Sequence, residues 1–179
     1  MAHEEQREFI LDLKEEYPSF FSNVKVLDVG SLDINGSIKN FFSNSDYTGI
    51  DIGEGKNVDI VVEGQKFDAE DETYDVVASC ECFEHNPYWK ETFQNMIRMC
   101  KSGGLIFMSC ATEGRPEHGT INTDIGSSPL TVAKGWNYYR NLTEKDFRDI
   151  EIEYDVVFNV YDFFIDEFVR DLYFYGIKK

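Results

Sequence analysis

The chain alternates between short apolar runs and longer stretches in which apolar residues recur every three or four positions. The apolar runs are rich in β-branched residues and predict strands over residues 24–29, 47–52, 58–62, 74–79 and 105–109. The helical periodicity predicts helices that lie before Pro18, over 36–43 and, most clearly, over 87–101. Strands that alternate with helices at this spacing predict a parallel, doubly wound α/β sheet with helices on both faces.

The final third follows a different pattern. Thr143 is predicted to cap a short helix over 144–150, and two apolar runs over 152–158 and 171–177 follow with no helix between them. Two strands in that order predict an antiparallel pair at one edge of a mostly parallel seven-stranded sheet. We therefore predict one domain over residues 1–179, made of an N-terminal helix and lead-in, a half with parallel strands, a loop region and a C-terminal helix and strand pair, at 1–23, 24–110, 111–141 and 142–179.

Residues 111–135 show no periodicity and hold several glycines and prolines. Loops of this length in a compact domain are usually functional lids or disordered segments. The loop leaves the fifth predicted strand at the carboxyl edge of the sheet, which is where doubly wound folds bind ligands. We therefore predict that it is a lid over a substrate, more mobile than the sheet in the free protein.

Acidic residues outnumber basic ones by 34 to 17 among 179, which gives a formal charge of −17. Such a charge repels phosphate backbones and anionic membranes, so we expect neither nucleic acid nor membrane as a partner. It is also what a well-solvated surface alone would give. No apolar stretch is long enough to span a bilayer, and the first residues are acidic and amphipathic rather than signal-like, so we expect a cytoplasmic protein. The sequence indicates no oligomeric state.

The cysteines show no metal-binding or disulfide pattern. Cys80 and Cys82 lie two positions apart at a predicted strand end, and Cys100 and Cys110 are single residues in apolar surroundings. Reduced, mostly buried thiols are the simplest explanation. No metal site is predicted.

The residues that follow each predicted strand are the first candidates for a site. Gly30 and Gly36 would allow a sharp turn and a close backbone approach after the first strand, although two glycines also fit an ordinary turn. Asp51 closes the second strand, 23 residues after Asp28. Nucleotide-binding folds place there an acid that accepts hydrogen bonds from ribose hydroxyls. The alternative for Asp51 is an acid that caps the turn before Gly53.

Taken together, these motifs resemble those of class I S-adenosylmethionine-dependent methyltransferases, the group that includes many small-molecule and sugar methylases. The resemblance covers about half the chain, from Val24 to Cys110. The segments that carry it are VKVLDVGS, YTGIDI, YDVVASCECFEH and IRMCKSGGLIFMS, with a further match at WNYYRNLTEKDF. It makes residues 24–110 the cofactor-binding half and S-adenosylmethionine the cofactor.

The resemblance also implies roles for single residues. Gly30 and Ser31 would lie under the methionine part of the cofactor, Asp51 would bind the ribose and Ile52 would pack on the adenine. The set of cofactor-binding residues that it implies is Asp28, Gly30, Ser31, Asn35, Gly36, Asp51, Ile52, Glu63, Gly64, Cys80 and Glu81. Glu63 would accept from the adenine amino group. Leu32 and Ile34 stand where the family usually has glycines, so the loop is longer and Asn35 would face the cofactor carboxylate.

Methyl transfer from a sulfonium is an in-line displacement that depends mainly on positioning, but a hydroxyl acceptor must also lose its proton. His118 and His85 are the candidate bases, while His3 lies too near the terminus. A structural role for His85 and a solvated one for His118 are the alternatives.

The candidate substrate-binding residues are Arg115, Trp136, Tyr139 and Arg140. The arginines could bind an acidic group of the acceptor or pair with surface acids, and the aromatic residues could form a wall of the site or simply pack in the core.

We therefore predict an enzyme that transfers a methyl group from S-adenosylmethionine to a small molecule or saccharide, most simply at an oxygen atom. One alternative is a regulatory or scaffold protein that binds the nucleoside cofactor without turnover. Another is a nicotinamide-dependent oxidoreductase, against which the missing dinucleotide fingerprint and the antiparallel C-terminal pair both argue.

Overall fold

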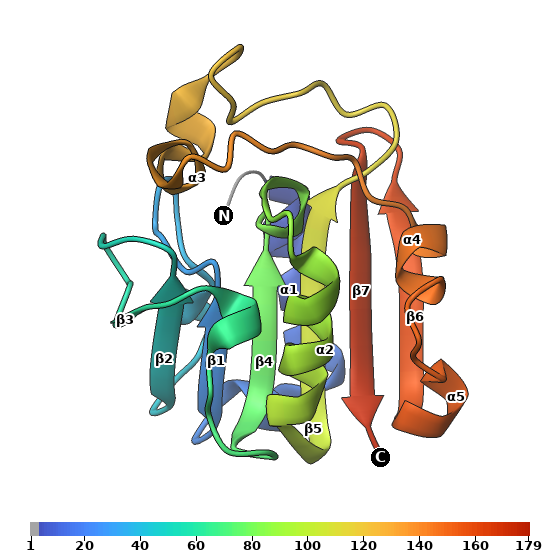
Figure 1. Ribbon diagram of the computed structural model, residues 1–179. Coiled ribbons are helices and arrows are strands. Elements are labelled where there is room, and N and C mark those ends of the chain that lie inside the picture. The colour runs from blue at the N-terminus through green and yellow to red at the C-terminus, as the bar shows by residue number, and fades with distance from the viewer. Residues whose placement is uncertain (1–3) are drawn as a thin grey trace.

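The computed structural model describes residues 4–179, which form one seven-stranded sheet with helices on both faces (Figure 1). The strands are ordered β3-β2-β1-β4-β5-β7-β6. Neighbouring strands from β3 to β5 are parallel, and β7 lies antiparallel to both β5 and β6. The predicted fold class, a mostly parallel α/β sheet with an antiparallel C-terminal pair, is confirmed.

The strands span β1 (Lys25–Val29), β2 (Asp46–Asp51), β3 (Ile60–Val61), β4 (Tyr74–Cys80), β5 (Cys100–Ala111), β6 (Phe158–Asp166) and β7 (Asp171–Lys178). The α-helices span α1 (Glu4–Glu16), α2 (Trp89–Met99), α3 (Pro129–Lys134), α4 (Glu144–Arg148) and α5 (Tyr154–Val157). Short 3₁₀ turns lie at η1 (Pro18–Phe21), η2 (Ile38–Phe41), η3 (Gly64–Lys66), η4 (Phe83–His85) and η5 (Ile125–Ser127). No helix among residues 4–179 is long and apolar enough to cross a bilayer.

Two apolar clusters hold the layers together. Helix α1 lies behind the sheet in Figure 1 and packs Phe9 and Ile10 against Val26 and Phe107. On the opposite face α2, α4 and α5 form the second layer, with its own cluster of buried aromatic and aliphatic residues. Each strand of the centre is therefore covered on both sides, which explains why the strand runs are apolar without alternation.

Several predicted elements differ in extent. The predicted strand over 152–158 is wrong, because residues 154–157 form α5 and β6 begins only at Phe158. The apolar alternation there arises from a turn that buries Tyr154, whose hydroxyl donates to the Phe147 carbonyl at 3.0 Å. The predicted strand over 58–62 is reduced to Ile60–Val61, and the helix over 36–43 to a 3₁₀ turn at Ile38–Phe41.

The segment predicted to lack structure, 111–135, contains η5 and α3. Helix α3 begins with Pro129 at a first helical position and ends at Gly135, whose φ of 82° is left-handed. In Figure 1 this segment passes over the carboxyl ends of the central strands, and α3 lies above β2. The local signals for α3 are Pro129 and Gly135, but the helix is only six residues long, too short to show a period.

Candidate active site

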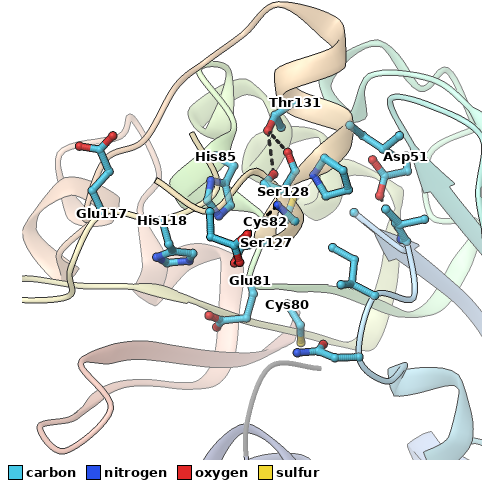
Figure 2. Close-up of a pocket in the computed structure, with 18 of the residues that line it drawn as sticks. Asp51, Cys80, Glu81, Cys82, His85, Glu117, His118, Ser127, Ser128 and Thr131 are labelled. Atoms are coloured by element: carbon cyan, nitrogen blue, oxygen red, sulfur yellow. Dashed lines mark hydrogen bonds between the residues drawn. The ribbon is translucent and has the colours of Figure 1, made fainter. Parts of the chain in front are cut away.

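A cavity of about 580 Å³ lies at the carboxyl ends of the central parallel strands (Figure 2). Its walls come from the turn after β1, from Asp51 at the end of β2 and from the residues after β4. Its roof comes from the 111–135 segment. The lining residues are Gly30, Leu32, Ile34, Asn35, Asp51, Cys80, Glu81, Cys82, His85, Arg115, Pro116, Glu117, His118, Asp124, Gly126, Ser127, Ser128, Pro129, Leu130 and Thr131.

The turn after β1 depends on Gly30. Its φ is 84°, and a Cβ there would lie 2.6 Å from Cys82 Sγ, so no larger residue fits without a shift. The longer loop that follows is anchored to β2, because the Leu32 N–H donates to Asp51 Oδ2 at 3.0 Å. Leu32 and Ile34, which stand where the family usually has glycines, line the cavity together with Asn35.

Asp51 lies at the edge of this cavity with its carboxylate already oriented. One oxygen accepts from the Leu32 N–H and the other from the Ile52 N–H at 2.7 Å. Burial raises the pKa of Asp51, while these two hydrogen bonds act against that rise. Each oxygen keeps a further lone pair, which is what binding of a vicinal diol requires.

Asp28 and Ser31, both predicted to contact the cofactor, do not line the cavity. Asp28 is buried within β1 and accepts a hydrogen bond from the Tyr47 hydroxyl. Burial raises the pKa of its carboxyl to about 7. Ser31 donates to the Asn57 carbonyl at 3.1 Å and so fastens the β1 turn to the loop after β2. In this structure both residues support the walls of the cavity.

The residues predicted around the adenine lie outside the larger cavity. Ile52 and Gly64 line a second cavity of about 40 Å³ together with Thr131 and Trp136. Glu63 does not line either cavity; it forms ion pairs with Lys66 at 2.8 Å and with Lys134 of α3 at 3.2 Å. Gly36 also lies outside both lining sets and donates its N–H to Asp33.

Cys80 ends β4, Glu81 and Cys82 follow it, and all three line the cavity (Figure 2). Glu81 has a left-handed φ of 53° and accepts from the Ser109 hydroxyl at 2.7 Å. Burial raises the pKa of both thiols, so both stay protonated at neutral pH and are poor nucleophiles.

The two predicted histidines meet at one end of the cavity. Although 33 positions separate them in sequence, the rings of His85 and His118 are 5.0 Å apart and nearly perpendicular. The Tyr139 ring lies 4.9 Å from His118 and 5.5 Å from His85. Burial lowers the pKa of His85 to about 3 and also lowers that of His118, so both rings are neutral at pH 7. His3 lies outside the described residues.

The remaining predicted substrate residues have their own partners. Arg115 lines the cavity but pairs with buried Asp171 at 3.1 Å. Arg140 pairs with Asp146, and neither it nor Tyr139 is among the residues that line the cavity. Trp136 contacts Tyr88 edge-on at 5.6 Å beside the smaller cavity. The structure thus brings together the histidines and Arg115, but not Arg140.

Sequence reasoning missed the contribution of α3 and the turn before it. Ser127, Ser128 and Thr131 present hydroxyl groups at the roof, and a hydrogen bond of 2.7 Å joins Ser128 to Thr131 (Figure 2). Leu130 packs so closely on the turn after β2 that a Cβ on Gly53 would lie 2.7 Å from it. The predicted lid therefore covers the cofactor end of the cavity as well as the substrate end.

A family model described as a methyltransferase domain matches residues 1–140. The chain belongs to this methyltransferase family. Its membership confirms the resemblance to methyltransferases that the motifs predicted. Solved structures of the same fold are complexes with S-adenosylmethionine or S-adenosylhomocysteine, which agrees with the predicted cofactor. No curated protein sequence matches the chain significantly.

Solved structures share the fold at low sequence identity. Phosphoethanolamine N-methyltransferase 2 of Haemonchus contortus is 12% identical with a TM-score of 0.64, and the match covers 96% of this chain and 52% of that one. The 1,6-didemethyltoxoflavin-N1-methyltransferase of Burkholderia thailandensis is 13% identical with a TM-score of 0.59, covering 98% and 83%. The YcgJ protein of Bacillus subtilis is 10% identical with a TM-score of 0.63, covering 96% and 99%. The chain thus spans about half the length of the nematode enzyme.

Proposed function

We propose that this methyltransferase moves the methyl group of S-adenosylmethionine to an oxygen atom of a small, uncharged or cationic acceptor. The observation that carries the proposal is the cavity of about 580 Å³ that has Asp51 in one wall and the two histidines in another. The Haemonchus and Burkholderia enzymes were crystallised with S-adenosylhomocysteine and with phosphomonomethylethanolamine or 1,6-didemethyltoxoflavin. Their acceptors support a small molecule here.

The cofactor would bind with its ribose on Asp51 and its methionine part along the β1 turn. The two Asp51 oxygens are held by backbone N–H groups and can each accept one ribose hydroxyl. Asn35, Cys80 and Glu81 then surround the methionine part. The adenine would extend towards the smaller cavity beside Ile52 and Gly64, where α3 covers it.

The reaction itself needs alignment and loss of a proton. The acceptor oxygen attacks the methyl carbon as the carbon–sulfur bond breaks, which yields the methylated acceptor, S-adenosylhomocysteine and one proton. Alignment inside a closed cavity can supply several kcal/mol of rate enhancement, on the order of 7–11 kcal/mol at best. We propose His118 and His85 as the residues that prepare the acceptor oxygen for attack.

The charges around the cavity indicate the class of acceptor. Glu81, Glu117 and Asp124 line it, whereas Arg115 is already paired with Asp171. An anionic acceptor would therefore meet net repulsion and have no unpaired guanidinium to bind. The hydroxyl groups of Ser127, Ser128 and Thr131 would suit a polyhydroxylated acceptor such as a saccharide.

Two measurements test this function. S-adenosylhomocysteine should raise the melting temperature of the full chain, whereas NAD should not. Incubation with S-adenosylmethionine labelled on its methyl group and a panel of neutral and cationic small molecules should then transfer the label, read by mass spectrometry. Stabilisation by NAD alone would favour the oxidoreductase alternative. Binding of S-adenosylhomocysteine without any transfer would favour a regulatory protein.

A further inference from the structure

The acceptor end of the cavity contains a cluster that the family resemblance did not predict. Glu84 and His85 lie in η4, directly after β4, and His118 comes from the roof segment. One potential ligand atom from each of the three lies within 4.8 Å of the other two. Figure 2 shows the His85 and His118 side chains next to each other at one end of the cavity. Cysteine spacing alone predicted no metal site, whereas the candidate ligands here are two imidazoles and a carboxylate.

Glu84 is the first reason to expect a cation here. Its side chain is fully buried, and neither carboxylate oxygen makes a hydrogen bond to any of the residues 4–179. The backbone N–H groups of Glu84 itself and of Ala111 favour a charge on this carboxyl, while Glu81 and Asp171 oppose it by repulsion. A buried carboxylate in such surroundings either stays protonated or needs a positive charge beside it.

The two histidines provide the second reason. His118 Nδ1 lies 3.1 Å from the Pro116 carbonyl, so this nitrogen carries the hydrogen and Nε2 carries the lone pair. His85 has a hydrogen-bond contact with the Tyr138 backbone, while its buried Nδ1 has no partner among the described residues. Each ring is thus oriented by a backbone group on one nitrogen and open on the other. Metal-binding histidines are normally held in this way.

We propose that Glu84, His85 and His118 bind one divalent first-row transition-metal ion, such as Zn²⁺, Mn²⁺ or Co²⁺. Two imidazole nitrogens and one carboxylate oxygen form a donor set that these ions accept with coordination positions to spare. Mg²⁺ and Ca²⁺ prefer sites built of oxygen ligands, so they fit less well. Bonds of about 2.0–2.2 Å require the three ligand atoms to draw closer together than 4.8 Å. His118 lies on the roof loop and can supply that movement.

The position of the ion gives it a role in the proposed reaction, and this step rests on the proposed function. His85 and His118 line the cavity but Glu84 lies behind it, so the open coordination positions face the acceptor. A hydroxyl bound to the ion loses its proton more readily, and that proton passes to solvent. The resulting alkoxide attacks the methyl carbon as the carbon–sulfur bond breaks. The histidines then act as ligands rather than as proton acceptors.

The test begins with the full chain freed of metal by a chelator and dialysis. Calorimetric titration with Zn²⁺ should show one ion per chain, and Co²⁺ should give the visible absorption of a site with nitrogen ligands. Glu84→Gln, His85→Ala and His118→Ala should each weaken Zn²⁺ binding by at least about tenfold. Glu91→Gln, a change of the same kind at an exposed position of α2, should leave it unchanged.

Folding of each variant is checked by its circular dichroism and by its affinity for S-adenosylhomocysteine. Glu84→Gln keeps the shape of the side chain and removes only the charge, so it should fold. Unaltered Zn²⁺ affinity in the three ligand variants would overturn the proposal and indicate the Cys80 and Cys82 thiols instead. No Zn²⁺ binding by the wild-type chain would also overturn it.

The proposed function and the metal site fail in different ways. S-adenosylhomocysteine should bind to the metal-free chain within a few-fold of its affinity for the Zn²⁺-loaded chain, because Asp51 lies on the opposite side of the cavity from His118 (Figure 2). Zn²⁺ binding without S-adenosylhomocysteine binding would contradict the proposed function alone. The reverse result would contradict the metal site alone.

Discussion

At the scale of single residues, two aspartates have different roles because one lines the cavity and the other is buried within a strand. Asp51 reaches the cavity with both oxygens already held by backbone N–H groups. Asp28, one residue before the end of the neighbouring strand β1, is buried against Tyr47 and lines neither cavity. Asp51 is placed to bind a ligand, whereas burial destabilises the charged form of Asp28.

Replacement of Asp51 by alanine should weaken binding of S-adenosylhomocysteine by about 1–3 kcal/mol, the range for loss of a hydrogen bond to a charged group. Asp12→Ala, at an exposed position of α1, is the matched control and should leave affinity unchanged. Calorimetry at pH 7 provides the measurement. Equal affinity in wild type and Asp51→Ala would show that the ribose lies elsewhere.

Asp28 should make the stability of the protein depend on pH. Its pKa rises from an ordinary 3.8 to about 7 on folding, so the native state holds a proton that the unfolded state releases between these values. The free energy of unfolding should therefore fall as pH rises from about 4 to 7. Asp28→Asn keeps an acceptor for the Tyr47 hydroxyl and should flatten this fall, by a few kcal/mol at most. Urea unfolding at pH 5 and pH 8 measures the difference, and equal pH dependence in both proteins would contradict it.

At the scale of elements, α3 is the helix through which the predicted lid covers the cavity. It spans only six residues, Pro129–Lys134, and is attached to the sheet by Leu130 on the turn after β2 and by the Lys134–Glu63 ion pair. Lys134 is 39% exposed in this pair, and ion pairs with a solvated partner contribute little, about 0–1 kcal/mol, so the attachment can open. A weakly attached helix over the cavity is suited to admit ligands and then exclude water.

Gly135→Ala should loosen this lid without damage to the core. Gly135 ends α3 at a φ of 82°, and no atom lies within 4 Å of an added Cβ, so the cost is backbone strain of about 1 kcal/mol. Gly103→Ala is the control, because Gly103 has a φ of 77° and an added Cβ there would also meet no atom within 4 Å. Gly103 lies in β5 and not in the segment that covers the cavity. Both variants should lose similar global stability. Only Gly135→Ala should weaken binding of S-adenosylhomocysteine and speed amide exchange in α3, as hydrogen-exchange mass spectrometry would show; equal effects in both would mean that α3 is not a lid.

At the scale of the whole molecule, the net charge of −17 limits the partners. We expect no affinity for duplex or single-stranded nucleic acid at physiological salt, because binding depends on lysines and arginines that displace counterions. A gel-shift series from low to physiological salt would measure this. Salt-sensitive binding with a submicromolar Kd would count against a small-molecule acceptor.

Much of the fold could be predicted from the sequence because patterns among neighbouring residues determine its helices and strands. Each central strand is an apolar run closed by a polar or glycine residue, and α2 carries a clear helical period. The predicted strand over 152–158 was wrong because an alternating run fits either a strand or a tight helical turn. The hydrogen bond from Tyr154 to Phe147 favours the turn, and it forms only in the folded protein. The elements at the sheet edge are shorter than predicted because few neighbouring residues pack against them.

The sequence by itself determined the sheet, its antiparallel end, the family and the position of Asp51 after the second strand, because periodicity and motif spacing are properties of neighbouring residues. Only the tertiary structure decided which predicted residues share the cavity. It placed Asp28, Ser31 and Glu63 in supporting contacts, and it brought His118 from the roof to His85 and Glu84. The physical reason is that side chains more than 30 positions apart meet only when the chain folds, and burial then sets their charge and hydrogen bonding.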